Sequence, residues 1–308
     1  MTSVVFERRG AGNVIVMRGP SPAATGSPTI GITIFRRVRQ ERLPPARISM
    51  SRIVALTCLV IASLAVPPVL AADLLPHEGN YAIRLGTSPT APQVGTARQL
   101  LGMDCQVWRL ERDIKTDIGL AASLRLTSES ELRGAEPRDG SAFDYQLRRA
   151  QNGREQSLSG RVKVGKNSAQ ATIIWPSRPV TVDLPADIAL PVAGFARVID
   201  ALKGGATSFS FALFDPELTG DALQIDGGII PADTLRPARP DAPKLPAGTT
   251  WPVEISFTRA GGRALFTVTL LMHEAGLLDR LTINTGLIAA SADLVTFKPL
   301  PRPDCPTS

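Results

Sequence analysis

Alternation of apolar and polar residues in short segments is the feature that most constrains the fold of this chain. Residues 80–85 alternate in this way, as do 106–111 and 122–127, so each segment would turn one face to a core and one to water. Turn-forming pairs such as Asn152-Gly153 and Gly261-Gly262 separate the segments. Further strands are predicted at 142–148, 155–164, 170–175, 179–184, 207–214, 222–230, 251–259, 263–272, 279–286 and 292–298. The pattern indicates an all-β protein.

One segment departs from the period of two. Between residues 192 and 202 the apolar side chains recur at steps of three and four, and Gly204-Gly205 follows as a stop signal, so we expect a single helix. The stretch from Pro231 to Pro252 holds four more prolines and predicts an extended loop. Such a loop can also mark a domain boundary, but cysteines on both sides of it favour a loop within one unit.

The first 49 residues have no pattern that predicts a fold. They hold eight arginines against two acids, with scattered Gly and Pro and no sustained apolar period. The simplest interpretation is a start codon placed upstream of the true one, at Met50. A long twin-arginine leader with the pair Arg36-Arg37 is the alternative.

Residues 50–72 predict a secretory signal peptide. A basic start at Arg52 precedes an apolar run from Ile53 to Val66, a Pro-Pro break, and a small-residue end at Ala71-Ala72. The run has 14 residues, whereas a membrane anchor needs about 20. A lipoprotein signal is the other alternative because Cys58 lies inside the run, although it is not at the end. We therefore expect 1–49 to be absent from the mature protein and 73–308 to be a single domain in the bacterial periplasm.

The cysteines support a single closed unit. Cys58 leaves with the signal peptide, so the 236 residues of 73–308 retain only Cys105 near the start and Cys305 near the end. In an oxidising compartment an even pair predicts a disulfide. Two unrelated buried thiols are the alternative.

The basic charge of the chain belongs to its leader. The whole sequence is +6, but residues 1–72 contribute nine arginines and two acids, which leaves 25 basic and 26 acidic residues in 73–308. A strongly basic chain would suggest a nucleic-acid or membrane-surface partner. The mature domain is nearly neutral, so we predict no nucleic-acid partner.

Motifs for cofactors and metals are incomplete. Residues 160–167 nearly spell a phosphate-binding loop, but Asn167 stands where Ser or Thr should hold magnesium, and the segment alternates as a strand. His273-Glu274 begins like a zinc-protease helix, yet Leu277 replaces the second histidine. The mature domain has no histidine beyond His77 and His273, which excludes a His-rich metal site but not a carboxylate site. We predict no cofactor and no metal.

Catalytic signals are equally unspecific. A Gly-x-Ser-x-Gly elbow is absent, and His77 has no partner motif, so it is interpreted as a polar residue beside a strand. Asp215 and Glu217 flank a proline, and Asp221 and Asp226 follow shortly afterwards. A glycosidase needs two carboxyl groups at a set separation, so these acids, like His273, are interpreted as surface and turn residues. We predict no catalytic residues and no enzyme.

Segments at both ends of the mature chain resemble a known family. These are Leu75-Pro76-His77-Glu78 leading into 80–85, the early strand pair ending at Asp104-Cys105, and Leu300-Pro301-Arg302-Pro303-Asp304-Cys305. Together they resemble the envelope-integrity protein B family of alphaproteobacterial periplasmic proteins, over essentially all of 73–308. The resemblance implies a twisted, incomplete β-barrel, or β-spiral, of about fourteen strands with one short helix and one disulfide. It also implies a role in cell-envelope integrity without enzymatic activity.

Three functions from different classes remain at the level of sequence. The first, which we favour, is a non-catalytic scaffold or adaptor that presents its curved sheet to other periplasmic or envelope proteins. The second is a carrier of lipid or acyl chains on an open β half-barrel, which the small number of aromatic residues makes less favoured. The third, a hydrolase of peptidoglycan or polysaccharide, is disfavoured by the missing motifs. None of the three needs a membrane span.

Overall fold

A computed structural model describes residues 74–305 except 89, 122–123, 176–177, 219 and 260–261. These residues belong to one compact unit. The predicted upstream extension 1–49 and the signal peptide 50–72 lie outside the described residues. No helix in the described part of the chain is long and apolar enough to cross a membrane.

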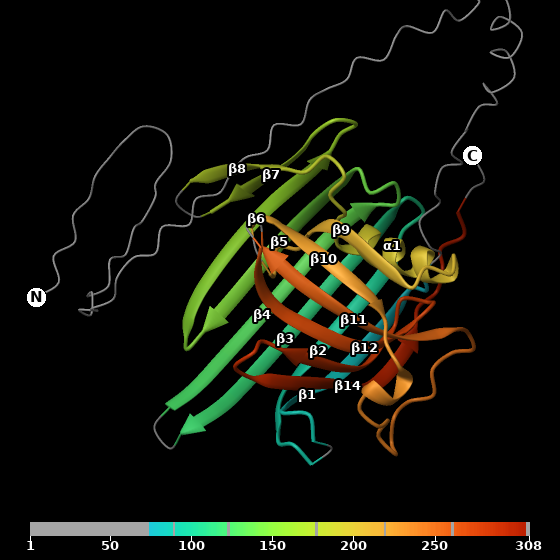
Figure 1. The fold of residues 1–308 in the computed structure, drawn as a ribbon. Helices are drawn as coiled ribbons and strands as arrows, with labels where there is room; N and C mark the ends of the chain where they lie inside the picture. The colour runs from blue at the N-terminus through green and yellow to red at the C-terminus, as the bar shows by residue number, and fades with distance from the viewer. Residues whose placement is uncertain are drawn as a thin grey trace, which may run out of the picture. The chain divides into compact units, whose positions relative to one another are not determined.

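Fourteen antiparallel strands form one sheet in the described part of the chain (Figure 1). The strands are β1 (His77–Leu85), β2 (Gln93–Met103), β3 (Val107–Ala121), β4 (Leu124–Pro137), β5 (Ala142–Gln151), β6 (Arg154–Val164), β7 (Ala169–Ile174), β8 (Pro179–Leu184), β9 (Ser208–Phe214), β10 (Ala222–Ile229), β11 (Thr250–Arg259), β12 (Arg263–His273), β13 (Leu278–Asn284) and β14 (Ala289–Pro299). A helix, α1 (Pro191–Lys203), and a 3-10 turn, η1 (Ala232–Thr234), complete the elements. The predicted all-β class is confirmed, and among the described residues α1 is the one α-helix, as predicted.

The sheet curls without closing. Its order is β8-β7-β6-β5-β4-β3-β2-β1-β14-β13-β12-β11-β10-β9, so the first and last strands pair in the middle and the edges are β8 and β9. In Figure 1 the strands β9–β12 lie in front of the long strands β3–β6. Strands β3–β6 form one wall of the curled sheet, and β9–β12 form the other. The two walls meet where Tyr145 on β5 contacts Phe214 on β9, with ring centroids 5.9 Å apart. The incomplete barrel implied by the family resemblance is therefore present.

The inner face of the long strands forms one part of the core. Leu110, Leu132, Leu147 and Val162 come from β3 to β6 and are at most 2% exposed. Glycines on this face make room for aromatic rings. A Cβ atom at Gly160 would lie 2.5 Å from the ring of Tyr145, so this strand position requires glycine.

The outer face of the same strands is covered by cross-strand ion pairs. Arg98 on β2 contacts Glu78 on β1 at 3.0 Å and Asp113 on β3 at 3.2 Å, and Arg133 on β4 contacts Asp113 at 2.7 Å. Because these side chains are partly exposed, each pair adds about 1 kcal/mol or less to stability. Their main effects are to keep a wide sheet soluble and to favour its strand register.

The α1 helix is capped by a distant strand. Leu190 at its N-cap makes no side-chain cap hydrogen bond, and Pro191 begins the helix. Glu136 at the end of β4 instead accepts hydrogen bonds from the backbone N–H groups of Val192 (2.8 Å) and Ala193 (2.7 Å). The carboxyl group therefore satisfies two amide donors that a helix start leaves free.

The tail of the domain is joined to its beginning. A disulfide links Cys105, between β2 and β3, to Cys305, with Cα atoms 5.3 Å apart. The backbone N–H of Leu300 also donates to Pro76 O at 2.8 Å. The described tail after β14 is thus held to the segment before β1 and to the turn between β2 and β3.

Most predicted elements are confirmed, with three corrections. The helix predicted at 192–202 is α1, and the proline-rich loop is present as far as residue 249, although Pro252 lies inside β11. The alternating pattern misses β2, because its residues mix small, polar and apolar types without a period of two. The strand predicted at 122–127 is the start of β4, whose first residue is Leu124.

Candidate functional site

An apolar pocket of about 380 Å³ lies among α1, β9–β13 and one residue of the opposite wall. Its lining includes Val198 of α1, Ile225 of β10, Ile255 of β11 and Met272 of β12, all buried. Pockets of this size with apolar walls and a few polar groups are the usual form of a small-ligand site.

Aromatic side chains stand at the more exposed part of the pocket. Phe257 of β11 and Phe266 of β12 stack with ring centroids 4.6 Å apart. Both are partly exposed, as are Phe195 of α1 and Ile283 of β13. The pocket therefore has a buried aliphatic part and an aromatic margin in contact with solvent.

The polar end of the pocket is an ion-pair cluster that crosses between the two walls. Arg112 on β3 contacts Asp215 (Nη2–Oδ2, 2.7 Å) and Glu217 (Nη1–Oε2, 2.9 Å), both in the turn after β9. The hydroxyl of Ser130 on β4 donates to Glu217 at 2.7 Å, and Arg149 on β5 donates to Pro216 O at 2.8 Å. Strands β3, β4 and β5 of one wall thus hold the turn that follows β9 in the other wall.

The charged groups of this cluster pair with one another, although Arg112 Nε makes no hydrogen bond to a described residue. The side chains of Asp215 and Glu217 are only 8% and 6% exposed, and Arg112 is 17% exposed. Burial raises the pKa of Glu217, while the adjacent Arg112 guanidinium opposes that shift. Arg112 faces both carboxyl groups, and the charge of Arg149 also acts on Glu217, so two guanidinium groups balance two carboxyl groups at this end of the pocket.

The interpretation of these acids as solvated turn residues is wrong for the first two. Asp215 and Glu217 do lie at a turn, but it faces inward against Arg112, and both side chains are buried. Asp221 and Asp226 are exposed, as predicted. The sequence gives no signal for the inward turn because its partner Arg112 is 103 residues away.

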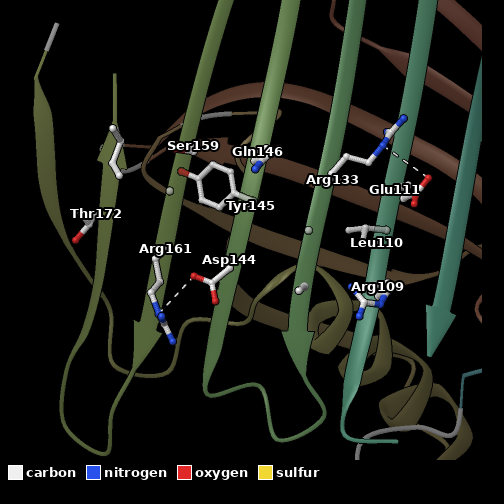
Figure 2. A pocket seen from close by; sticks show the side chains of 14 residues that line it. Arg109, Leu110, Glu111, Arg133, Asp144, Tyr145, Gln146, Ser159, Arg161 and Thr172 are labelled. Atoms are coloured by element: carbon white, nitrogen blue, oxygen red, sulfur yellow. Dashed lines mark ion pairs between the residues drawn. The ribbon is translucent and has the colours of Figure 1, made fainter. Parts of the chain in front are cut away.

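A second depression lies on the outside of β3–β7 and has a volume of about 480 Å³. Figure 2 shows its side chains, among which Arg161 pairs with Asp144 (3.4 Å) and Arg133 with Glu111 (3.7 Å). At its edge Ile174 is 53% exposed. This outer groove is open, and its charged side chains pair with one another across neighbouring strands.

The two histidines are buried, so the interpretation of His273 as a surface residue is wrong. His273 is 1% exposed; its Nδ1 accepts from Ala275 N at 3.0 Å, and its Nε2 lies 3.1 Å from Pro246 O. The hydrogen bond at Nδ1 places the ring proton on Nε2, which donates to the carbonyl. His77 is fully buried, and its Nδ1 lies 2.7 Å from Leu75 O. Burial lowers the pKa of His77, which favours the neutral ring.

These contacts give the described part of the chain no evident chemistry. Both histidine rings bond to backbone atoms rather than to a nucleophile. No group of three or more His, Cys, Asp or Glu side chains among the described residues is placed to hold a metal ion. The segment 160–167 that resembles a phosphate-binding loop is the end of β6 and the following turn.

Comparison with known proteins identifies the family. A family model described as EipB-like matches residues 69–301. The chain belongs to the EipB-like family. The fold of this member is similar to a crystal structure described as a β-barrel-like protein of domain of unknown function DUF1849 from Brucella abortus. The TM-score is 0.66 at 15% identity, over 75% of this chain and 100% of the other. Curated proteins include no similar sequence.

Proposed function

We propose that the protein is a non-catalytic binding protein of the periplasm that supports cell-envelope integrity. The observation that carries the proposal is the apolar pocket, whose charged residues are already paired with one another. Such a site favours binding over catalysis, because its polar groups face each other rather than a reacting atom. Membership of the EipB-like family is consistent with the envelope role.

Export to the periplasm is part of this proposal. Its support is the signal peptide predicted at 50–72 together with the disulfide between Cys105 and Cys305. Disulfides of this kind persist in oxidising compartments.

A scaffold or adaptor for other envelope proteins is one form of this function. The long strands β2–β6 provide a wide outer face, on which the outer groove and the exposed Ile174 are accessible to a partner. Site-specific photo-crosslinking from position 146, which lines the groove, would capture such a partner in the periplasm. Absence of any specific adduct in a strain that needs the protein would argue against the adaptor.

A carrier of lipid or acyl chains is the second candidate, and the pocket is the observation that favours it. The test is complementation of a deletion strain under detergent stress. Ile255→Trp fills the buried part of the pocket, whereas Gln146→Ala changes the outer groove. If a folded Ile255→Trp protein fails to complement the deletion strain, the pocket is needed for the function. Full complementation by this variant would refute that role of the pocket.

A further inference from the structure

We infer that the pocket takes one acyl chain of a membrane phospholipid, which enters beside the tip of the β13–β14 hairpin. The inference rests on the proposed binding function of the pocket and adds the class of ligand and its route of entry.

The lining of the pocket fits a hydrocarbon chain. Its walls are aliphatic and aromatic side chains from α1 and five strands. The buried residues Val198, Ile225 and Ile255 offer no hydrogen-bonding group to a ligand. A ligand that reaches this part must therefore be apolar along its length, because an unpaired polar atom would lose its hydration there.

The charges at the polar end disfavour a free fatty acid whose carboxylate would lie at that end. A fatty-acid carboxylate needs a cation to bind it, but Arg112 is engaged by both Asp215 and Glu217. A further carboxylate would add negative charge beside two carboxyl groups. The occupant is therefore a chain whose inner end is uncharged and whose head group stays at the solvent side of the pocket.

The hairpin tip continues directly from the pocket lining. Ile283 lines the pocket, and the turn at 284–288 follows it and exposes Leu287 (94%) and Ile288 (45%). No charged residue occurs from Leu281 to Ala292. An uncharged segment with a fully exposed leucine is suited to a lipid surface.

The tip is also fixed in place by its own hydrogen bonds. Gly286 N donates to Asn284 Oδ1 at 2.8 Å, and Ile288 N donates to Thr285 Oγ1 at 3.1 Å. Gly286 has φ +82°, which favours glycine. Leu287 is thus held in solvent by a structured turn, next to a strand that leads into the pocket.

The test uses the mature protein and vesicles of phosphatidylethanolamine and phosphatidylglycerol that contain a pyrene-acyl phosphatidylethanolamine. Uptake is followed by loss of excimer fluorescence, and stoichiometry by native mass spectrometry of the separated protein. We expect one phospholipid per chain. Ile255→Trp should lose uptake to background, because the indole fills the buried part of the pocket.

Leu287→Asp should slow uptake from vesicles several-fold but leave binding of a monomeric lysophospholipid unchanged. Ile229→Asp is the matched control, since Ile229 is 42% exposed on β10 and does not line the pocket, and it should behave as the wild type. Circular dichroism and thermal melts verify that each variant is folded.

The outcomes separate this inference from the proposed function. Absence of bound lipid, uptake by a folded Ile255→Trp protein, or palmitate binding as tight as phospholipid binding would each overturn the acyl-chain inference. Equal slowing by Leu287→Asp and Ile229→Asp would overturn the entry route. If no lipid binds but Ile255→Trp still fails to complement the deletion strain, the pocket serves another apolar ligand and the proposed function survives.

Discussion

Replacing Glu136 with alanine removes the carboxyl group that caps α1 from the end of β4. The side chain is 1% exposed and accepts the N–H groups of Val192 and Ala193. Leu190 supplies no cap of its own, so the substitution leaves two amide donors without an acceptor near the core. Both the helix and its attachment to the long strands depend on this contact.

The size of the expected stability loss follows from the two lost hydrogen bonds. An unsatisfied buried donor costs about 1–3 kcal/mol, and loss of a helix cap costs about 0.5–2 kcal/mol. Glu136→Ala should therefore lower the free energy of unfolding by about 2–4 kcal/mol at pH 5. For a domain of this size that is a fall in Tm of about 5–15 °C. Glu136→Gln should also destabilise, because its amide places a donor against one of the helix N–H groups.

The loss of stability caused by Glu136→Ala depends on pH, and the direction of this dependence follows from the pKa of Glu136. Burial raises the pKa of Glu136 to about 8 in the folded protein, although the two amide donors oppose the shift. The unfolded chain has the ordinary value of 4.5. The wild type should therefore lose stability as the pH rises from 4.5 to 8, by up to about 1.4 kcal/mol per unit. The difference between wild type and Glu136→Ala should narrow over this range.

Guanidinium unfolding followed by circular dichroism, at pH values from 5 to 8, measures this difference. Glu155→Ala is the control, since Glu155 lies on the outer face and pairs with Arg148 there. It should show neither the loss nor the pH dependence. A loss below about 0.5 kcal/mol for Glu136→Ala, or a difference that widens with pH, would refute the reasoning.

Three further predictions follow from other contacts. Cys105→Ser or Cys305→Ser should each lower stability by up to about 5 kcal/mol from the loop-entropy estimate, with no further loss in the double variant; two free thiols in acid-quenched periplasmic protein would contradict this. Arg112→Met should lower the free energy of unfolding by about 3–5 kcal/mol, because two buried carboxyl groups lose their counter-ion; an unchanged denaturation midpoint would contradict it. N-terminal sequencing of the exported protein should give a start at residue 72 or 73, and any periplasmic peptide from 1–49 would refute the leader assignment.

The accuracy of the sequence-based predictions differs between residues for physical reasons. Alternation correctly predicts strands such as those containing Ala82 and Ile255, because burial on one face is a local property of a strand. It fails at β2, where the residues have no clear period. The interpretation of Asp215 and His273 as surface residues also fails, because a short polar sequence is compatible with an outward or an inward turn.

The sequence by itself determined the all-β class, the single α-helix and the pair of cysteines available to close the mature domain. The fold class and the helix depend on neighbouring residues and on turn formation, and the pair of cysteines can be counted in the sequence. Only the tertiary structure decided that Glu136 caps a helix 56 residues away and that Arg112 joins Asp215 across the sheet. The apolar pocket likewise depends on how far the sheet curls. Curl and long-range register arise from packing of the two walls against each other, and local periodicity does not encode that packing.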